Sequence, residues 1–478
     1  MKHFIFILSI SLSSLALYAQ NVAINNDASL PNPSAVLDVK SSSKGLLIPR
    51  MSTAQRKAIA GAVAGLLVFD LDKSTIYLYD GQKWQAMLFT SSDAVNPPIA
   101  RASSDGAAGD KFGISVSISG NYAIVGAYLD DVGTKIDQGS AYIFIREDGL
   151  WQEQAKLTAS DGGAGDNFGN NVSMSGDYAV VGSPKASSVW ALQGAAYVFV
   201  RTGTNWVQQA KLTAADGIIG DYFGTSVSIN NDYVIAGAPN AGITYANQGA
   251  AYIFARTGTT WAEQAKLTYA GGQFNDYFGN SVSINGNYAF VGAPYFDWFF
   301  PNQGSAFIFI RSGSTWTYQM KVEATDGAAD DYFASSISID GDYALIGAPY
   351  DDGSFVNQGS AYIFLRSGTT WTQQTKLIAD NNQLNANYGN SVSLNGQYAA
   401  IGAIYENVGS SPYHPQEGAA YIYRRTGTFW DVVRQVKDGA GQTNGFFGSA
   451  VGVSGFNYII GAAGKNGSKG EISFLNIE

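Results

Sequence analysis

Cysteine is absent from the 478-residue sequence, and histidine occurs only at His3 and His414. Without cysteine the chain cannot form disulfides, use a thiol nucleophile or bind a metal through thiolates. A Ser-His-Asp triad or a histidine zinc site needs convergent imidazoles, so this composition argues against both. We interpret His414, within the segment SSPYHPQEG, as a solvated loop residue.

Charged residues are also scarce, at 14% of the chain, and the formal net charge is −10. Nucleic-acid binding needs a basic stripe on the protein surface, and the sequence contains none. Nucleic acid is therefore not expected as a partner.

Long apolar runs are missing except at residues 4–17. This run follows Lys2, precedes a plausible cleavage site near Ala19 and is too short for a comfortable membrane span. Residues 1–20 are therefore predicted to be a signal peptide. The protein is expected to be secreted or displayed at the cell surface, with no transmembrane segment.

Glycine and aromatic residues are plentiful, and they occur in a repeated pattern. Seven copies, 55 to 59 residues apart, open at Phe112-Gly113, Phe168-Gly169, Phe223-Gly224, Phe278-Gly279, Phe333-Ala334, Tyr388-Gly389 and Phe447-Gly448. Such a period indicates an array of equal supersecondary units that bury their apolar faces against one another.

Each copy contains four candidate strands. In the fourth copy they are FGNSVSI (278–284), YAFVGAP (288–294), GSAFIFIR (304–311) and WTYQMKVEA (316–324). The first and second are joined by a tight Gly-Asn or Gly-Asp turn that is typical of a hairpin, and the turn between the third and fourth is also short. The pattern predicts an all-β fold: a seven-bladed β-propeller of four-stranded antiparallel blades.

The seventh copy lacks a Trp-led fourth strand after GEISFLNIE, and the segment before the first copy aligns with the end of that strand elsewhere. Residues from about 97 to 103 are therefore predicted to supply the outer strand of the last blade. Completing that blade closes a ring and removes an exposed edge, which favours a ring over an open solenoid.

Residues 21–93 do not carry the repeat and form a separate small mixed α/β module, before a propeller over residues 94–478. We expect an extended stretch, a short helix from Ser52 or Thr53 to Ala60, and a β meander. The segments LLIPRM, AQR and YDGQKW resemble an N-terminal module of secreted Bacteroidetes-type surface proteins. That resemblance implies a role in surface display or assembly.

The repeats resemble the FG-GAP repeat of integrin α-subunit heads and bacterial secreted proteins. Phe-Gly opens the copies, and Gly-Ala-Pro ends the second strand at 237–239, 292–294 and 347–349. The resemblance implies a seven-bladed propeller that serves adhesion or ligand binding. Integrin-type blades often hold calcium in a DxDxDG loop, but here a two-residue turn replaces that loop and cannot supply 6–8 oxygen ligands. No metal or cofactor is therefore predicted.

Other acidic residues recur between copies and are interpreted as turn formers, namely Asp105, Asp161, Asp216 and Asp326, with Asp110, Asp166, Asp221, Asp276 and Asp331. Better calcium candidates, left open, are Asp130 and Asp131 with Asp137, and Asp351 with Asp352. The Trp that opens each fourth strand, the Phe of Phe-Gly and the Gln before each third strand are interpreted as structural.

The loops between the second and third strands vary between copies, and they emerge on the same face as the connections between copies. That face is the expected binding face. Its run YFDWFFPNQG (295–304) places consecutive aromatics in a loop, which is costly without a partner. The candidate ligand-binding residues are Trp190, Tyr245, Tyr295, Trp298, Phe299, Phe300 and Tyr350, and Tyr128, Phe355, Tyr405 and Tyr413 occupy similar loops.

The function expected from the sequence is a non-catalytic binding or adhesion module for a protein or glycan. Nearly all of the polar residues named above recur across copies, whereas a catalytic centre should be unique to one or two. The alternatives are a secreted carbohydrate-active enzyme, such as a lyase or glycoside hydrolase, and a purely structural envelope component. The sequence leaves the oligomeric state open.

Overall fold

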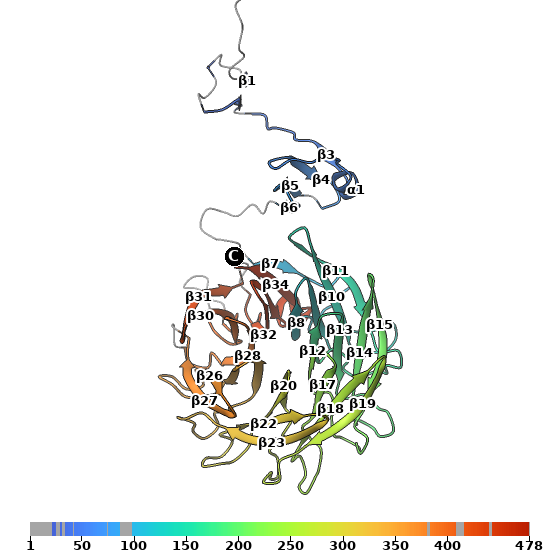
Figure 1. Cartoon of the computed structure of the whole chain (residues 1–478), viewed down its shortest axis with the longest axis vertical. Coiled ribbons are helices and arrows are strands. Elements are labelled where there is room, and N and C mark those ends of the chain that lie inside the picture. Colours follow the sequence, from blue (N-terminus) through green and yellow to red (C-terminus); the bar gives the residue numbers. More distant parts are fainter. Residues whose placement is uncertain are drawn as a thin grey trace, which may run out of the picture. The chain divides into compact units, whose positions relative to one another are not determined.

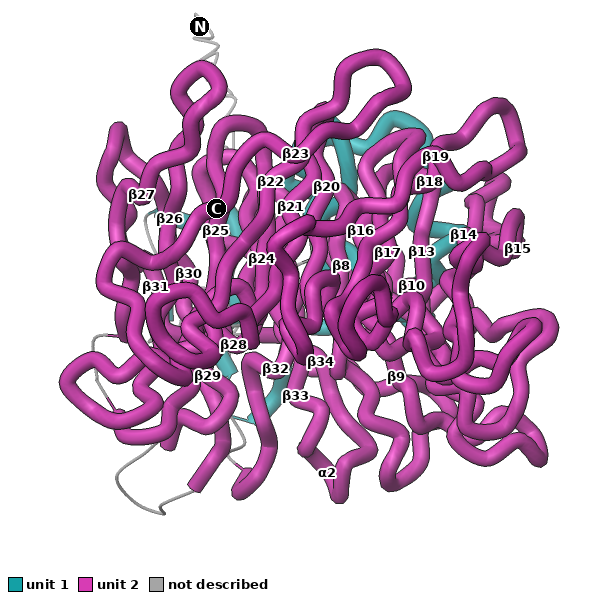
Figure 2. Tube along the Cα trace, turned by 90° about the horizontal axis from the view of Figure 1, so that it is seen from below, with its two compact units in different colours: residues 1–89 teal, residues 90–478 magenta. Residues whose placement is uncertain are grey.

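The structure is a computed structural model that describes residues 22–24, 29–30, 34–41, 43–73, 75–86, 98–379, 383–407, 415–438 and 442–477. The chain divides into two compact units, residues 1–89 (unit 1) and 90–478 (unit 2), which Figure 2 distinguishes by colour. The predicted signal peptide, Tyr413 and His414 lie outside the described residues. Among those described, no helix has the length and apolar composition needed to cross a membrane.

Unit 1 has two small sheets and one short helix. Strands β1 (Val22–Ile24) and β2 (Leu37–Val39) pair in parallel, and the second sheet has the order β3 (Arg50–Met51), β4 (Leu67–Asp70), β5 (Thr75–Tyr79) and β6 (Trp84–Ala86). Helix α1 (Thr53–Lys57) begins at a capping box formed by Ser52 and Gln55, as its sequence indicates. It ends at Lys57, earlier than the predicted Ala60.

A buried ion pair joins α1 to the second sheet. Arg56 and Asp70 are both fully buried, and Arg56 Nε donates to Asp70 Oδ2 over 2.8 Å. The guanidinium also lies 3.7 Å from the centroid of the Tyr77 ring. A five-residue helix is not stable by itself, so these contacts hold it in place.

Unit 2 contains seven four-stranded antiparallel sheets within its described residues. Sheet 1 comprises β8 (Ser115–Ser119), β9 (Tyr122–Ala127), β10 (Ser140–Glu147) and β11 (Leu150–Leu157); sheet 2 comprises β12 (Asn171–Ser175), β13 (Tyr178–Ser183), β14 (Ala195–Thr202) and β15 (Asn205–Leu212); sheet 3 comprises β16 (Ser226–Asn230), β17 (Tyr233–Ala238), β18 (Ala250–Thr257) and β19 (Thr260–Leu267). Sheet 4 comprises β20 (Ser281–Asn285), β21 (Tyr288–Ala293), β22 (Ser305–Ser312) and β23 (Thr315–Val322); sheet 5 comprises β24 (Ser336–Asp340), β25 (Tyr343–Ala348), β26 (Ser360–Ser367) and β27 (Thr370–Leu377). Sheet 6 comprises β28 (Tyr388–Asn395), β29 (Tyr398–Ala403), β30 (Ala419–Thr426) and β31 (Phe429–Lys437); sheet 7 comprises β32 (Phe447–Ser454), β33 (Asn457–Ala462), β34 (Glu471–Asn476) and β7 (Ile99–Arg101), with the short helix α2 (Lys465–Ser468) before β34.

The sheets of unit 2 surround a common centre (Figure 1), with first strands such as β8, β12 and β28 inside and fourth strands such as β15, β19 and β27 outside. Each sheet is open, with two edge strands. In sheet 7 the outer strand is β7, which pairs antiparallel with β34 through Ile99 and Phe474. The fold is all-β, and its repeated antiparallel sheets are consistent with a β-propeller.

The phenylalanine of each Phe-Gly pair packs between neighbouring sheets. Phe168 is fully buried in a cluster with Ile124 and Ile143 of sheet 1 and with Tyr197 and Phe199 of sheet 2. The equivalent residues are also buried, namely Phe112, Phe223, Phe278, Phe333, Tyr388 and Phe447. The prediction that this residue belongs to the core between neighbouring repeats is confirmed.

The tryptophans of the fourth strands also join neighbouring sheets. Trp261 Nε1 donates to Gln209 Oε1 of sheet 2 over 2.8 Å, and Trp316 Nε1 donates to Gln264 Oε1 of sheet 3 over 2.9 Å. Both rings are at least nine-tenths buried. The predicted structural role is confirmed for Trp261 and Trp316, because their rings are buried and their indole N–H groups are bonded within the protein.

Candidate ligand-binding face

The two ends of the sheets differ in the length of their connections. In sheet 4 the turns at residues 286–287 and 313–314 are short, whereas the loop at 294–304, between β21 and β22, is much longer. The long loop emerges at the same end as the connections between sheets. This end, called the loop face below, carries all the candidate binding residues.

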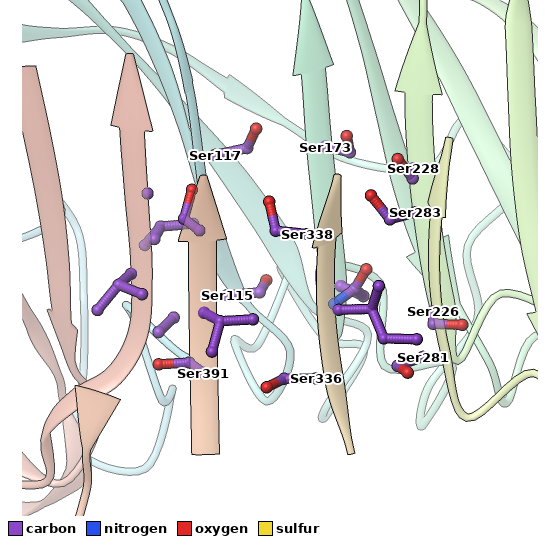
Figure 3. Close-up of a pocket in the computed structure, with 18 of the residues that line it drawn as sticks. Ser115, Ser117, Ser173, Ser226, Ser228, Ser281, Ser283, Ser336, Ser338 and Ser391 are labelled. Carbon is purple, nitrogen blue, oxygen red and sulfur yellow. The ribbon is translucent and has the colours of Figure 1, made fainter. Parts of the chain in front are cut away.

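A polar cavity of about 320 Å³ lies between the first strands of the sheets. Two levels of serine hydroxyls line it (Figure 3), with Ser117, Ser173, Ser228, Ser283 and Ser338 at one level and Ser115, Ser226, Ser281, Ser336 and Ser391 at the other.

These serines bond one sheet to the next. Ser283 Oγ accepts the Ile339 N–H of sheet 5 over 3.1 Å, and Ser281 donates its hydroxyl to Ala334 O over 2.7 Å. Because the same bonds recur around the cavity, we interpret the serines of its wall as residues that hydrogen-bond neighbouring sheets together.

A Tyr-Asp-Lys network recurs near the loop face. In sheet 5, Tyr362 donates its hydroxyl to Asp326 Oδ1 over 3.1 Å, and Lys376 Nζ lies 2.7 Å from carboxylate oxygens of both Asp326 and Asp351. Burial alone would raise the pKa of Asp326, but its bond to Lys376 holds that pKa below the usual value. Sheets 1, 2 and 3 have the same network, with Tyr142, Asp105 and Lys156; Tyr197, Asp161 and Lys211; and Tyr252, Asp216 and Lys266.

The calcium candidates are used within these loops. Lys156 Nζ lies 2.7 Å from Asp130 Oδ2, as Lys376 does from Asp351. Asp131 accepts the backbone N–H of Asp137 over 2.9 Å, and Asp352 accepts that of Asn357 over 2.7 Å. Among the described residues, no group of three His, Cys, Asp or Glu side chains is placed to hold a metal ion.

Sheet 4 departs from this network. Phe307 stands where the tyrosine would be and Gly271 where the aspartate would be, and Phe296 occupies the position of Asp351. Phe307 instead packs against Tyr269, with ring centroids 4.5 Å apart, and against Phe296, at 5.4 Å. An aromatic cluster therefore replaces the polar network. Lys321 is the counterpart in sheet 4 of the network lysine, Lys376.

Lys321 holds an exposed aromatic residue of the loop. Its Nζ lies 3.1 Å from the centroid of a Trp298 ring and 2.5 Å from Glu323 Oε1. Trp298 is nevertheless 50% exposed, Phe299 76% and Phe300 49%. The cation–π contact orders an otherwise exposed ring. Trp298, Phe299 and Phe300 are called the aromatic patch below.

A second aromatic group, the tyrosine row, consists of Tyr277, Tyr295, Tyr332 and Tyr350. Successive ring centroids lie 5.0, 4.9 and 5.2 Å apart. The structure thus brings together the two predicted residues, Tyr295 and Tyr350. The sequence prediction missed Tyr277 and Tyr332, although a tyrosine directly before Phe in the third, fourth and fifth copies was a visible signal.

The remaining candidates, Trp190 and Tyr245, are about half exposed in the loops of sheets 2 and 3. Among the described rings, neither contacts the aromatic patch or the tyrosine row. Their backbone N–H groups donate to the side chains of Gln193 and Gln248, respectively. This confirms the structural role predicted for glutamines before the third strands.

The repeated open sheets and their variable loop face define a propeller-type repeat protein. The family model described as FG-GAP repeat matches residues 102–144, 151–199, 206–254, 261–309, 316–364 and 371–423, more than half of the chain. The chain therefore belongs to the FG-GAP repeat family. Residues 23–97 match a model described as a phage tail like trimerisation region. No curated protein matches the chain.

Proposed function

We propose that this protein is an exported, non-catalytic binding module whose seven sheets form a seven-bladed ring. Hydrogen bonds between successive sheets support the ring. Gly176 N–H donates to Ser119 Oγ between sheets 2 and 1, and Gly120 N–H donates to Ser454 Oγ in the same way between sheets 1 and 7. Export rests on the predicted signal peptide at residues 1–20.

The aromatic patch is the observation that carries the binding proposal. Three adjacent large rings are each about half exposed or more exposed than that, and Lys321 fixes one of them before any partner arrives. Aromatic side chains dominate binding hot spots, and an ordered ring loses little entropy on association. The proposed partner at this patch is a protein or glycan.

The test is a search for partners with glycan arrays and protein pull-downs, using the wild type and the Trp298→Ala/Phe299→Ala variant. Phe429→Ala is the matched control, because Phe429 is 73% exposed but starts β31 at the opposite end of the sheets. The proposal expects binding that the double variant loses and the control keeps. Full binding by the double variant would refute the patch, and polysaccharide turnover without stable binding would favour the carbohydrate-active enzyme.

Unit 1 supports a second element of the proposal, that three copies of the chain associate through it. The family model for residues 23–97 is described as a trimerisation region. Apolar side chains of the β1–β2 sheet are exposed, including Val22, Ile24, Leu37 and Val39. A two-stranded sheet is marginal alone, so burial between copies would stabilise it. Three linked modules would also bind a multivalent surface more tightly than one.

Light scattering of the full chain tests this association. The wild type is expected at three chain masses and Leu37→Asp/Val39→Asp at one. Ile219→Asp, at a residue 64% exposed in unit 2, should leave the mass unchanged. A monomeric wild type would refute the trimer and favour a single binding module or envelope component.

A further inference from the structure

We propose that a pocket at the loop end of the central cavity binds a neutral sugar residue. The pocket has a volume of about 470 Å³ and is lined by residues of sheets 2, 3 and 4 and their connections, including Tyr222, Tyr277 and Tyr295. Asn280 lines both this pocket and the central cavity, which places the pocket at the mouth of the cavity. Its volume is within the usual range of small-ligand sites. It is called the mouth pocket below.

Aromatic rings supply one half of sugar recognition. The centroids of Tyr277 and Tyr295 are 5.0 Å apart with their planes at 57°, so the two rings present differently oriented surfaces. Tyr295 is 40% exposed and can receive a ligand. The C–H face of a pyranose is apolar and packs on a tyrosine ring, while its equatorial hydroxyls point outward to polar partners.

Amide side chains supply the other half. Asn170 donates through Nδ2 to Thr225 O over 3.2 Å, and Asn240 donates through Nδ2 to Asn247 Oδ1 over 3.4 Å. Among the described residues both amide oxygens therefore remain acceptors for ligand hydroxyls. The side chain of Asn280 adds one more amide to the lining.

The charge of the lining selects among sugars. None of the residues that line the mouth pocket is Asp, Glu, Lys or Arg, although the protein as a whole has a net charge of −10. A sugar acid, a phosphosugar or an amino sugar would lose hydration there without gaining an opposite charge. A neutral pyranose loses only hydroxyl hydration, which the amides and phenols replace.

The mouth pocket is separate from the aromatic patch. The patch is three apolar rings on one loop, whereas the pocket combines rings and amides around a hollow. This inference rests on the proposed binding function and names the ligand class for a second site on the same face. Failure of one site therefore leaves the other testable.

The register of the repeats provides a folding-safe variant. Tyr277 has a φ of +52°, a conformation that disfavours most side chains, and the second and sixth copies carry Asn167 and Asn387 there with φ of +56° and +51°. Asparagine tolerates this conformation better than most residues. Tyr277→Asn therefore removes the pocket ring without straining the backbone.

The experiment measures binding of methyl glycosides of glucose, galactose and mannose to the full chain, by saturation-transfer NMR and calorimetry. Glucuronic acid and glucosamine are the charged counterparts, and Phe429→Ala is the control, because Phe429 is exposed at the opposite end of the sheets. We expect at least one neutral glycoside to bind with a Kd on the order of 1 mM. Tyr277→Asn should weaken it about tenfold, and Phe429→Ala should leave it unchanged.

Three results would overturn the mouth-pocket proposal. They are no binding by any neutral glycoside, equal binding by Tyr277→Asn, and equal binding of the charged sugars. If the mouth pocket fails while Trp298→Ala/Phe299→Ala still abolishes partner binding, the proposed function stands. If Tyr277→Asn abolishes sugar binding and the double variant keeps its partners, the pocket stands and the patch does not.

Discussion

Sheets 4 and 5 are neighbours built from the same repeat, yet they differ beside the loop face. In sheet 5, Lys376 lies between two carboxylates, and Tyr362 donates its hydroxyl to one of them. Sheet 4 has Phe307 and Phe296 instead, and its lysine lies under Trp298. The repeat therefore determines the strands and their core, while a few substitutions convert an internal polar network into a support for an exposed ring.

The largest expected difference between the two sheets follows from their lysines. Lys376→Met would remove the positive charge between the carboxylates of Asp351 and Asp326. The side chain of Asp351 is only 5% exposed. We expect a loss of about 3 kcal/mol in unfolding free energy. Lys321→Met would place an apolar chain among aromatic rings and should cost no more than about 1 kcal/mol.

Urea unfolding of both lysine variants at pH 7 measures this difference. Equal losses would mean that the two lysines have the same structural role. The proposed distinction between a polar network and a ring support would then be wrong.

A second difference lies in the residue after the opening Phe. Gly279, before sheet 4, has a φ of +94°, and a Cβ added there would lie 2.3 Å from Ala250 O. Ala334, before sheet 5, already carries a Cβ at a φ of +70°. Gly279→Ala should therefore lower the unfolding free energy by about 2 kcal/mol, and Ala334→Gly should raise it by about 1 kcal/mol. Thermal melts that moved in the same direction for both variants would contradict the assignment of strain.

The smallest effect concerns a feature that the two sheets share. Burial raises the pKa of Asp276 and of Asp331 to about 6, despite backbone N–H bonds that lower it. Since these values exceed the unfolded value, the folded state retains protons that the unfolded state releases. The stability that Asp276 and Asp331 contribute is therefore fully present below about pH 4, and it declines as the pH rises to about 6.

Melting temperatures at pH 5 and pH 7 test this sign. The wild type should be more stable at pH 5, and Asp276→Asn/Asp331→Asn should lose most of that dependence while keeping an oxygen acceptor. Asp326→Asn is the control, because the pKa of Asp326 is lowered, and it should leave the pH dependence between 5 and 7 intact. A wild type that melts lower at pH 5 would refute the prediction.

Much of the strand arrangement could be predicted from the sequence, because the residues that determine it lie close together in the chain. The fourth copy was expected to have strands at 278–284 and 288–294. The structure has β20 at Ser281–Asn285, three residues later than the predicted start, and β21 at Tyr288–Ala293. The pairing of β7 with β34 joins segments far apart in the chain, and complementary incomplete copies were enough to predict it.

The site was less accessible to sequence reasoning, because its contacts depend on register across strands. Lys376 reaches Asp351 only because Tyr362 and Lys376 are directly opposite on paired strands. The sequence does not show this cross-strand contact, so the acidic pairs were interpreted as calcium candidates. In the same register Phe307 lies opposite Lys321, and no local pattern places that lysine under Trp298. Exposed aromatics in one loop, by contrast, were visible in the sequence.

The most direct test is the affinity of a captured partner for the wild type and for Trp298→Ala/Phe299→Ala, with Phe429→Ala as control. Melting curves should first establish that the variants are folded, since these side chains are half exposed or more. The account predicts a loss of about 30-fold or more for the double variant, because a hot spot is worth about 2 kcal/mol or more, and no change for the control. An unchanged affinity in the double variant would contradict the aromatic patch as the binding surface.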